Sequence, residues 1–142
     1  MKNEQFETYS KIKISFDLDG VLYGGKDTKN TRALYKILHR DQFTEVGILT
    51  GHSHDSEKWD IETILSYGLP APDFYFGRTP EYMDRNGAVY KSMIIKRENI
   101  DLHIDDYDYD YSETIKIFNN SDIEQKILRA KAFNNKDLPN NE

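Results

Sequence analysis

The sequence contains no cysteine, which excludes disulfide bonds, thiolate metal sites and a cysteine nucleophile. It also contains no apolar run near the ~20 residues that a membrane-spanning helix needs. The polar residues 1–10 lack the apolar core of a signal peptide. We therefore expect a soluble, cytoplasmic protein without a membrane partner.

Positive charge is scarce, because 19 lysines and arginines stand against 25 aspartates and glutamates and leave a net charge of −6. Proteins that grip long nucleic acids are usually basic, so we expect no extended nucleic-acid footprint. A nucleotide, or one nucleic-acid end held in a pocket, remains compatible with this charge. The acid is concentrated in Asp105, Asp106, Asp108 and Asp110, and such a cluster can hold a divalent cation because hard cations prefer oxygen ligands.

The length of 142 residues suits one domain with a substantial core and is too short for two ordinary domains. We predict a single domain over residues 11–133. Residues 1–10 are expected to form a loose lead-in and residues 134–142 a disordered tail.

Strand-like and helix-like segments alternate along the chain. Short apolar runs predict strands at 11–17, 45–50, 73–77, 100–104 and 114–118. Helical periodicity and turn residues predict helices at 31–40, 55–67, 88–97 and 121–133, and a loop or small hairpin at 20–30. This alternation predicts a three-layer α/β, Rossmann-like fold with about five mainly parallel strands and helices on both faces.

Two of these helices carry finer expectations. Asn30 or Thr31 is the expected N-cap of the first helix. The second helix is expected to turn an apolar side inward, consisting of Trp59, Ile61, Ile64 and Leu65.

The stretch 11–25, KIKISFDLDGVLYGG, is the most informative part of the sequence. Its apolar residues alternate with polar ones as in a strand, and the strand leads into Asp17 and Asp19. Residues two apart in an extended chain point to the same side. Two carboxylates that close are costly unless a cation or a proton lies between them. With Gly20 allowing a turn directly afterwards, this pattern indicates a site rather than a packing motif.

Polar residues also follow other predicted strands, with Thr50 and Asp105 at strand ends in the same way as Asp17. In parallel sheets, ligands bind outside the carboxyl ends of the strands, where the strand order reverses. Asp17 in this position can act as a nucleophile that forms an aspartyl phosphate. Mg²⁺ can bridge Asp17, a phosphate and Asp105, while Asp19 can serve as general acid and base.

The string DLDGVL at 17–22, preceded by an apolar strand, closely resembles the first motif of the haloacid dehalogenase (HAD) superfamily of phosphotransferases. ILTG at 48–51 resembles the second motif, a lysine in the helix before the fourth strand the third, and LHIDD at 102–106 the fourth. The resemblance spans residues 12–106 and implies a HAD-like fold.

The first two motifs imply roles for three residues. In the resembling phosphatases the second aspartate, here Asp19, is the general acid and base, and its backbone carbonyl ligates Mg²⁺. Family dehalogenases and P-type ATPases lack this aspartate, so its presence favours phosphatase chemistry. Thr50 corresponds to the residue whose hydroxyl binds a phosphate oxygen, with help from the Gly51 amide.

The last two motifs imply a lysine and a pair of metal-binding acids. Lys91 fits the lysine that pairs with Asp17 and the phosphate, and Lys96, late in the same helix, is the alternative. Asp105 corresponds to a metal ligand, and Asp106 to a residue that binds a metal-bound water or holds Lys91. The spacing from Lys91 to Asp105 is shorter than in many members, although compact nucleotidase-like members also have short spacings.

Several other polar residues carry weaker expectations. His52 and His54 are too few for a zinc site, and we interpret them as a loop near the substrate, with His52 touching it without being catalytic. Tyr23 and Arg78 are candidate substrate contacts. The tyrosines that follow strand four can stack on a base, form an aromatic rim or pack in the core; they are Tyr107, Tyr109 and Tyr111.

Many HAD proteins carry a cap domain between the first and second motifs or between the second and third. Here those intervals, 20–45 and 51–88, are too short for a folded cap, which predicts an open site that admits large substrates or is closed by a partner subunit. We expect a small, capless, Mg²⁺-dependent phosphohydrolase that cleaves a nucleotide, another small phosphate monoester or a polynucleotide end. The main alternative is a catalytically silent phosphate- or metal-binding regulatory module of the same fold. A receiver domain like those of response regulators is disfavoured because Asp17 and Asp19 lie at the first strand.

Overall fold

The computed structural model describes residues 11–25, 28–107, 109–118 and 122–134, and the structural statements below concern these ranges. The strands are β1 (Ile12–Phe16), β2 (Thr44–Ser53), β3 (Tyr75–Arg78), β4 (Leu102–Asp105) and β5 (Ile127–Arg129). The helices are α2 (Lys29–His39), α3 (Glu57–Ser66), α4 (Gly87–Arg97), α5 (Ser112–Phe118), α6 (Asp122–Gln125) and α7 (Lys131–Asn134). Short 3₁₀ turns, η1 (His54–Ser56) and η2 (Pro80–Tyr82), precede α3 and α4.

The strands form one five-stranded sheet in the order β3-β2-β1-β4-β5, and every neighbouring pair is parallel. The chain builds outward from β1 to β3 on one side and then returns to place β4 and β5 on the other. The strand order therefore reverses between β2 and β4, beside the carboxyl end of β1, which is where parallel sheets bind ligands.

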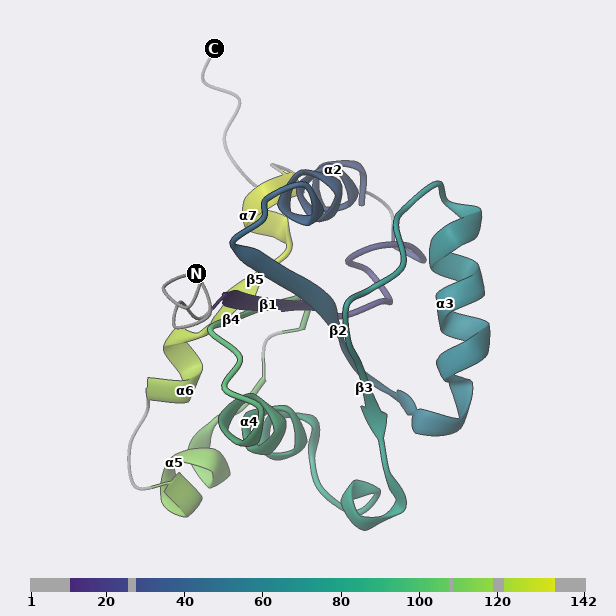
Figure 1. Ribbon diagram of the computed structural model, residues 1–142. Coiled ribbons are helices and arrows are strands. Elements are labelled where there is room, and N and C mark those ends of the chain that lie inside the picture. The colour runs from purple at the N-terminus through teal and green to yellow at the C-terminus, as the bar shows by residue number, and fades with distance from the viewer. Residues whose placement is uncertain (1–10, 26–27, 108, 119–121, 135–142) are drawn as a thin grey trace, which may run out of the picture.

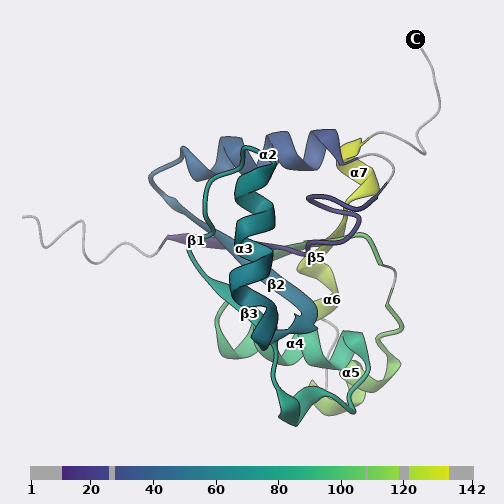
Figure 2. The same ribbon diagram turned by 90° about the vertical axis from the view of Figure 1, so that its right-hand side faces the viewer.

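Helices cover both faces of the sheet, so the predicted α/β, Rossmann-like, three-layer fold is confirmed. Helices α2 and α7 lie over one face and α4, α5 and α6 over the other (Figures 1 and 2). No cap domain is evident in the described part of the chain. None of its helices has the length and apolarity needed to cross a membrane.

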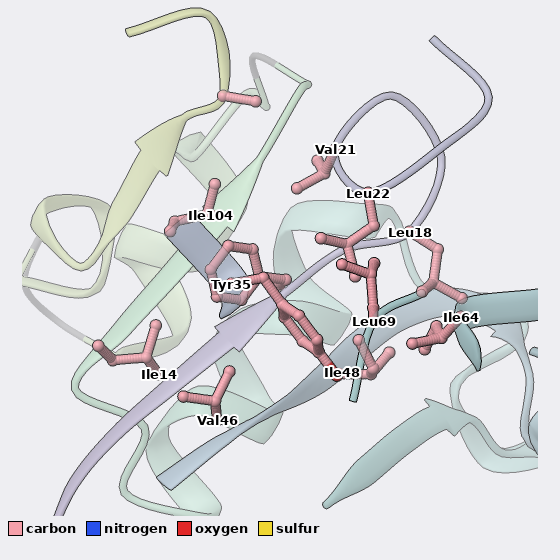
Figure 3. Packing of buried hydrophobic residues seen from close by; sticks show 12 residues of the cluster. Ile14, Leu18, Val21, Leu22, Tyr35, Val46, Ile48, Ile64, Leu69 and Ile104 are labelled. Carbon is pink, nitrogen blue, oxygen red and sulfur yellow. The ribbon is translucent and has the colours of Figure 1, made fainter. Parts of the chain in front are cut away.

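The two faces have separate apolar cores. On one face, Phe16, Ile48 and Ile104 of the central strands pack with Tyr35 of α2 and Ile64 of α3 (Figure 3). On the other, α4 packs against the sheet through a second buried group that comprises Leu49, Tyr90, Ile94, Ile95, Ile100 and Ile123. Full burial of one such side chain contributes roughly 1.5–3 kcal/mol, so both faces hold the sheet firmly.

Strand β1 presents a different chemistry to each face. Ile14 and Phe16 point into the core beneath α2, whereas Ser15 and Asp17 contact residues on the α4 side. The period-two geometry of a strand produces this separation. The central strand thus carries its apolar side chains to one layer and its first site residue to the other.

The C-terminal third differs from expectation. Residues 114–118, predicted as a strand, belong to helix α5, and the predicted helix 121–133 is interrupted by strand β5. Strand β5 takes the sheet edge beside β4, where the amide of Ala130 donates to the carbonyl oxygen of Asp105 at 2.7 Å. The segment 112–118 packs instead against α4.

Three finer expectations are also corrected. The N-cap of α2 is Thr28, so Asn30 and Thr31 lie inside the helix, where the Thr31 hydroxyl donates to backbone carbonyls. Trp59 and Leu65 are exposed, because α3 turns Asp60 and Ile64 inward. The expected tail at 134–142 begins with a residue that ends α7, and its remainder, like the lead-in 1–10, lies outside the described residues.

Candidate active site

The carboxylate of Asp17 is held at the carboxyl end of β1. Its Oδ1 accepts a hydrogen bond from the amide of Leu18 at 2.8 Å, and its Oδ2 accepts one from Lys91 Nζ at 2.9 Å. The same Nζ lies 2.5 Å from Asp105 Oδ2 at the end of β4. Lys91 is only 1% exposed and Asp105 is fully buried, so the lysine joins the ends of two strands beneath the surface.

The charges of this group stabilise one another. Burial alone would lower the pKa of Lys91, but Asp17 and Asp105 outweigh burial and raise the pKa above its usual value. Burial would likewise raise the pKa of Asp105, yet the hydrogen bond from His103 and the charge of Lys91 hold it well below its usual range. At neutral pH Lys91 is therefore an ammonium and Asp105 a carboxylate.

A buried chain of hydrogen bonds holds the carboxylate of Asp105 in place. His103 Nε2 lies 3.0 Å from Asp105 Oδ2, and His103 Nδ1 lies 2.7 Å from the hydroxyl of Ser15 on the adjacent strand. Burial lowers the pKa of His103, so the ring is neutral. Because a carboxylate only accepts, Nε2 donates to Asp105 and Nδ1 accepts from Ser15.

Ser15, His103 and Asp105 are all fully buried, so this chain orients Asp105 and is not a nucleophilic triad open to substrate. Sequence reasoning did not single out Ser15 or His103. The alternation of side chains along β4 could have predicted the contact between His103 and Asp105, because residues two apart in a strand share a face.

Three carboxylates form the part of the site best suited to a metal. One oxygen each of Asp17, Asp105 and Asp106 can be chosen so that all three lie within 4.8 Å of one another. Burial, together with the charges of Asp105 and Asp17, raises the pKa of Asp106, because like charges this close disfavour ionisation. An all-oxygen, strongly negative donor set fits a hard divalent cation such as Mg²⁺.

The turn after β1 brings Asp106 close to the backbone. Gly20 has a φ of +77°, and a Cβ added there would lie 2.0 Å from Asp106 Oδ2. The turn is closed by the amide of Gly20, which donates to the carbonyl oxygen of Tyr23 at 2.7 Å. The ring of Tyr23 stacks on that of Tyr67, so the turn is anchored to the end of α3.

Asp19 lies apart from the three-carboxylate cluster. Its side chain is 68% exposed, and its Oδ2 lies 2.7 Å from His52 Nε2. Both carboxylates of the first motif therefore reach the carboxyl end of the sheet, but they join different partners. Asp17 contacts Lys91 of α4, whereas Asp19 contacts His52 of β2.

His52 is itself held from within the protein. Its Nδ1 lies 3.1 Å from both oxygens of Asp60, a residue of α3 that is 1% exposed. The hydroxyl of Tyr75 donates to Asp60 Oδ2 at 2.6 Å. Burial would lower the pKa of His52, but its hydrogen bonds with Asp19 and Asp60 raise it. Sequence reasoning missed Asp60. The only signal for it was its acidic side chain at a position next to the apolar residues of its helix.

The residues of the second motif lie at the far end of β2. Thr50 is buried, and its hydroxyl oxygen accepts the amide of His52 at 3.1 Å, which leaves its hydrogen able to donate. Gly51 is exposed, with no atom within 4 Å of the position of a Cβ. Lys96, the alternative to Lys91, is exposed on α4.

The tyrosines after β4 flank the site. The Lys91 ammonium lies 5.5 Å from the ring centroid of Tyr109, and Tyr107 and Tyr111 pack against that ring in turn. A cavity of about 500 Å³ lies between these tyrosines and the start of α4, lined in part by Tyr107 and Tyr109. Arg78 instead stacks over the ring of Tyr90, 4.7 Å from its centroid.

Comparisons with protein-family models, with curated proteins and with solved structures find no match to this chain. The geometry alone therefore defines what the site can do. It offers a fixed carboxylate beside an ammonium, an oxygen-rich place for a cation, and a second carboxylate exposed to solvent.

Proposed function

We propose that this protein is a capless, HAD-like phosphohydrolase that uses Mg²⁺ and forms an aspartyl phosphate on Asp17. The observation that carries the proposal is the position of Asp17, whose two carboxylate oxygens are held by the Leu18 amide and by Lys91 Nζ. A carboxylate fixed in this way needs little rearrangement before it attacks. Asp106 beside it supplies a further carboxylate for a cation.

In the first step, an Asp17 oxygen attacks the phosphorus of a phosphate monoester, and the bond from phosphorus to the leaving oxygen breaks. Lys91 stabilises the negative charge that develops between the nucleophile and the phosphoryl group. Asp19 gives its proton to the leaving oxygen, which departs as an alcohol. Thr50 and the Gly51 amide are the proposed donors to the phosphoryl oxygens.

In the second step, water attacks the phosphorus of the aspartyl phosphate. Asp19, now a carboxylate, takes the proton of that water, and the bond between phosphorus and the Asp17 oxygen breaks. Inorganic phosphate leaves and Asp17 is restored. The high exposure of Asp19 supports this role, because the group must meet both a leaving alcohol and a water.

The proposed metal ligands are the carboxylates of Asp17, Asp105 and Asp106 together with the backbone carbonyl of Asp19. When bound, Mg²⁺ supplies positive charge that offsets repulsion between the carboxylates and the phosphate dianion. Lys91 contributes positive charge to the same balance through its ion pairs with Asp17 and Asp105.

The proposed substrates are a nucleotide, another small phosphate monoester or a polynucleotide end. The lack of a cap among the described residues supports an open site, and the cavity beside Tyr107 and Tyr109 offers room for a leaving group. A net charge of −6 disfavours a long nucleic-acid footprint. We propose that it acts in the cytoplasm, with which the lack of cysteine is compatible.

The test is the release of phosphate from a panel of aryl, alkyl and nucleoside monophosphates, with and without Mg²⁺, by the wild type and by Asp17→Asn. The variant keeps the shape of the side chain and removes the nucleophile. Losing it should cost on the order of 4 kcal/mol or more, roughly a thousandfold in rate. Asp41→Asn is a matched control, because Asp41 is exposed before β2 and its oxygen holds the amide of Phe43.

Turnover that requires Mg²⁺, that Asp17→Asn loses and that Asp41→Asn keeps would support the proposal. Equal turnover in wild type and Asp17→Asn would show that Asp17 is not the nucleophile. Binding of Mg²⁺ and phosphate without turnover of any substrate would favour the silent regulatory module instead.

A further inference from the structure

A chain of four side chains runs from the interior of the protein to Asp19. It passes from Tyr75 to Asp60, to His52 and then to Asp19, with distances of 2.6, 3.1 and 2.7 Å. Exposure increases toward its outer end, from 1% at Asp60 to 32% at His52 and 68% at Asp19. The chain thus connects the buried carboxylate of Asp60 to the exposed carboxylate of Asp19.

The geometry fixes the orientation of the His52 ring. Both ring nitrogens face carboxylates, and since carboxylates accept hydrogen bonds, each nitrogen is placed to donate. Nδ1 lies at equal distances of 3.1 Å from the two oxygens of Asp60. Asp60 is held in turn by the Tyr75 hydroxyl and by its place in α3, so the ring has little freedom to turn.

Other roles for His52 fit the structure less well. Among the described residues, the group able to hold a metal consists of Asp17, Asp105 and Asp106, and His52 is not part of it. A core histidine that merely satisfies its hydrogen bonds has no reason to keep one nitrogen at an exposed carboxylate. The contact with Asp19 is therefore the feature to explain.

We infer that His52 is a positioning residue, which Asp60 and Tyr75 anchor and which holds the carboxylate of Asp19 where it can exchange a proton with the leaving group. The inference rests on the proposed function, because it assigns a task to the general acid of that reaction. An exposed aspartate without such a tether samples several rotamers, and each wrong rotamer removes the proton donor from the reacting oxygen.

Two conservative variants separate the two contacts of the ring. In His52→Gln the side-chain amide can reach the position of Nε2 and still donate to Asp19. In His52→Asn the shorter amide can replace only Nδ1 and its contact with Asp60. His54→Asn is the matched control, because His54 lies two residues further on and its ring is 3.5 Å from Asp55.

The measured quantity is kcat/KM for two substrates whose leaving groups differ in their need for a proton. p-Nitrophenyl phosphate releases a stable anion, whereas glycerol phosphate releases an alkoxide that needs a general acid. General-acid catalysis contributes roughly 10²–10⁴-fold. In His52→Asn we expect kcat/KM for the alkyl substrate to fall by about a hundredfold and that for the aryl substrate by less than about fivefold.

His52→Gln should recover most of the alkyl activity, and His54→Asn should keep it. A purely structural role for His52 would lower kcat/KM for both substrates to the same extent. Equal losses of kcat/KM in His52→Asn would therefore overturn the inference, as would an unchanged kcat/KM for the alkyl substrate. If the wild type shows no Mg²⁺-dependent turnover of either substrate, that result would overturn the proposed function.

The contact can be tested without turnover. Nuclear magnetic resonance of the wild type should show slowly exchanging protons on both ring nitrogens of His52, and Asp19→Ala should abolish the protection at Nε2 alone. Ring protons that exchange rapidly in the wild type, or that ignore Asp19→Ala, would overturn the inference even in an active enzyme.

Discussion

Replacing Lys91 by methionine would remove the cation that lies between Asp17 and Asp105. Methionine keeps most of the apolar stem, which is buried with the rest of this 1%-exposed residue, so the change is mainly one of charge. Asp17 is 13% exposed and can recover some hydration, but Asp105 is fully buried and cannot. The variant therefore leaves a carboxylate in the interior without its ammonium partner.

Breaking a buried ion pair by removing one partner costs about 3–5 kcal/mol. Asp105 retains His103 Nε2 at 3.0 Å and the amide of Tyr107 at 3.2 Å, so we expect a value near the lower end. For a domain of this size each kcal/mol moves the melting temperature by about 2–4 °C, which predicts a fall of roughly 10 °C.

The loss should depend on pH with a defined sign. The pKa of Asp105 is lowered in the folded protein, so its contribution to stability is present above its unfolded pKa and is lost as pH falls through the folded value. Without Lys91 the carboxyl takes up a proton more readily. The difference between wild type and Lys91→Met should therefore be largest above about pH 5 and shrink toward pH 3.

The assay is urea unfolding followed by circular dichroism at several pH values without Mg²⁺, with Lys96→Met as the control on the exposed side of the same helix. Lys96→Met should change the unfolding free energy by less than about 0.5 kcal/mol, as exposed substitutions usually do. An unfolding free energy of Lys91→Met equal to or above that of the wild type at pH 7 would refute the reasoning.

Gly20→Ala should lower the unfolding free energy by more than Gly68→Ala, because both glycines have a positive φ that costs alanine about 1–2 kcal/mol, but only at Gly20 does the new methyl group meet Asp106. Urea unfolding of both variants measures this, and equal losses would contradict the expected clash between the added methyl group and the Asp106 carboxylate. His52→Gln should reduce stability more at pH 5.5 than at pH 9, since the pKa of His52 is raised and its contribution is present below about pH 6.5 and lost as pH rises through the folded value. A pH-independent loss in the same assay would contradict it.

The sequence predicted the sheet well where each strand is buried between two helical layers. The run IKISF and the apolar start of β2 have few alternatives, since Phe16, Ile48 and Leu49 must all be buried. The position of Asp17 follows from the same logic, because it directly follows β1. Lys91 was proposed instead from the family resemblance, and its Nζ lies 2.9 Å from Asp17 Oδ2. The pattern could not predict the buried hydrogen bonds that orient Asp105, because they depend on the pairing of Ser15 with His103 across two strands.

Helix α3 shows why apolar patterns can mislead at a site. Its sequence offered Trp59 and Leu65 to the core, and the structure buries Asp60 instead. The carboxylate is satisfied by His52 and Tyr75, so its burial costs less than a hydrophobicity scale assumes. A conflict between pattern and structure at this position is what the proposed role of the network would produce.

The prediction for the C-terminal third was wrong for a different reason. A run such as TIKIF at 114–118 is too short for periodicity to separate strand from helix. Long-range contacts decide the outcome, because Ile127 and Leu128 pair with β4 and each packs, partly buried, against one of the two cores. Asp110 Oδ1 also accepts the amide of Ser112 at 3.0 Å, which favours a turn into helix α5.

The strand order also bears on how the protein is made. The ribosome produces β1 first, yet β1 lies at the centre of the finished sheet and pairs on one side with β4 (Figure 1). At the usual speed of translation, β4 emerges on the order of ten seconds after β1. During that interval β1 has β2 as its one paired strand, and its other edge is open to wrong pairing. Interrupted chains that end before residue 127 would carry every proposed catalytic residue and still leave the strand with Asp105 as an unprotected edge.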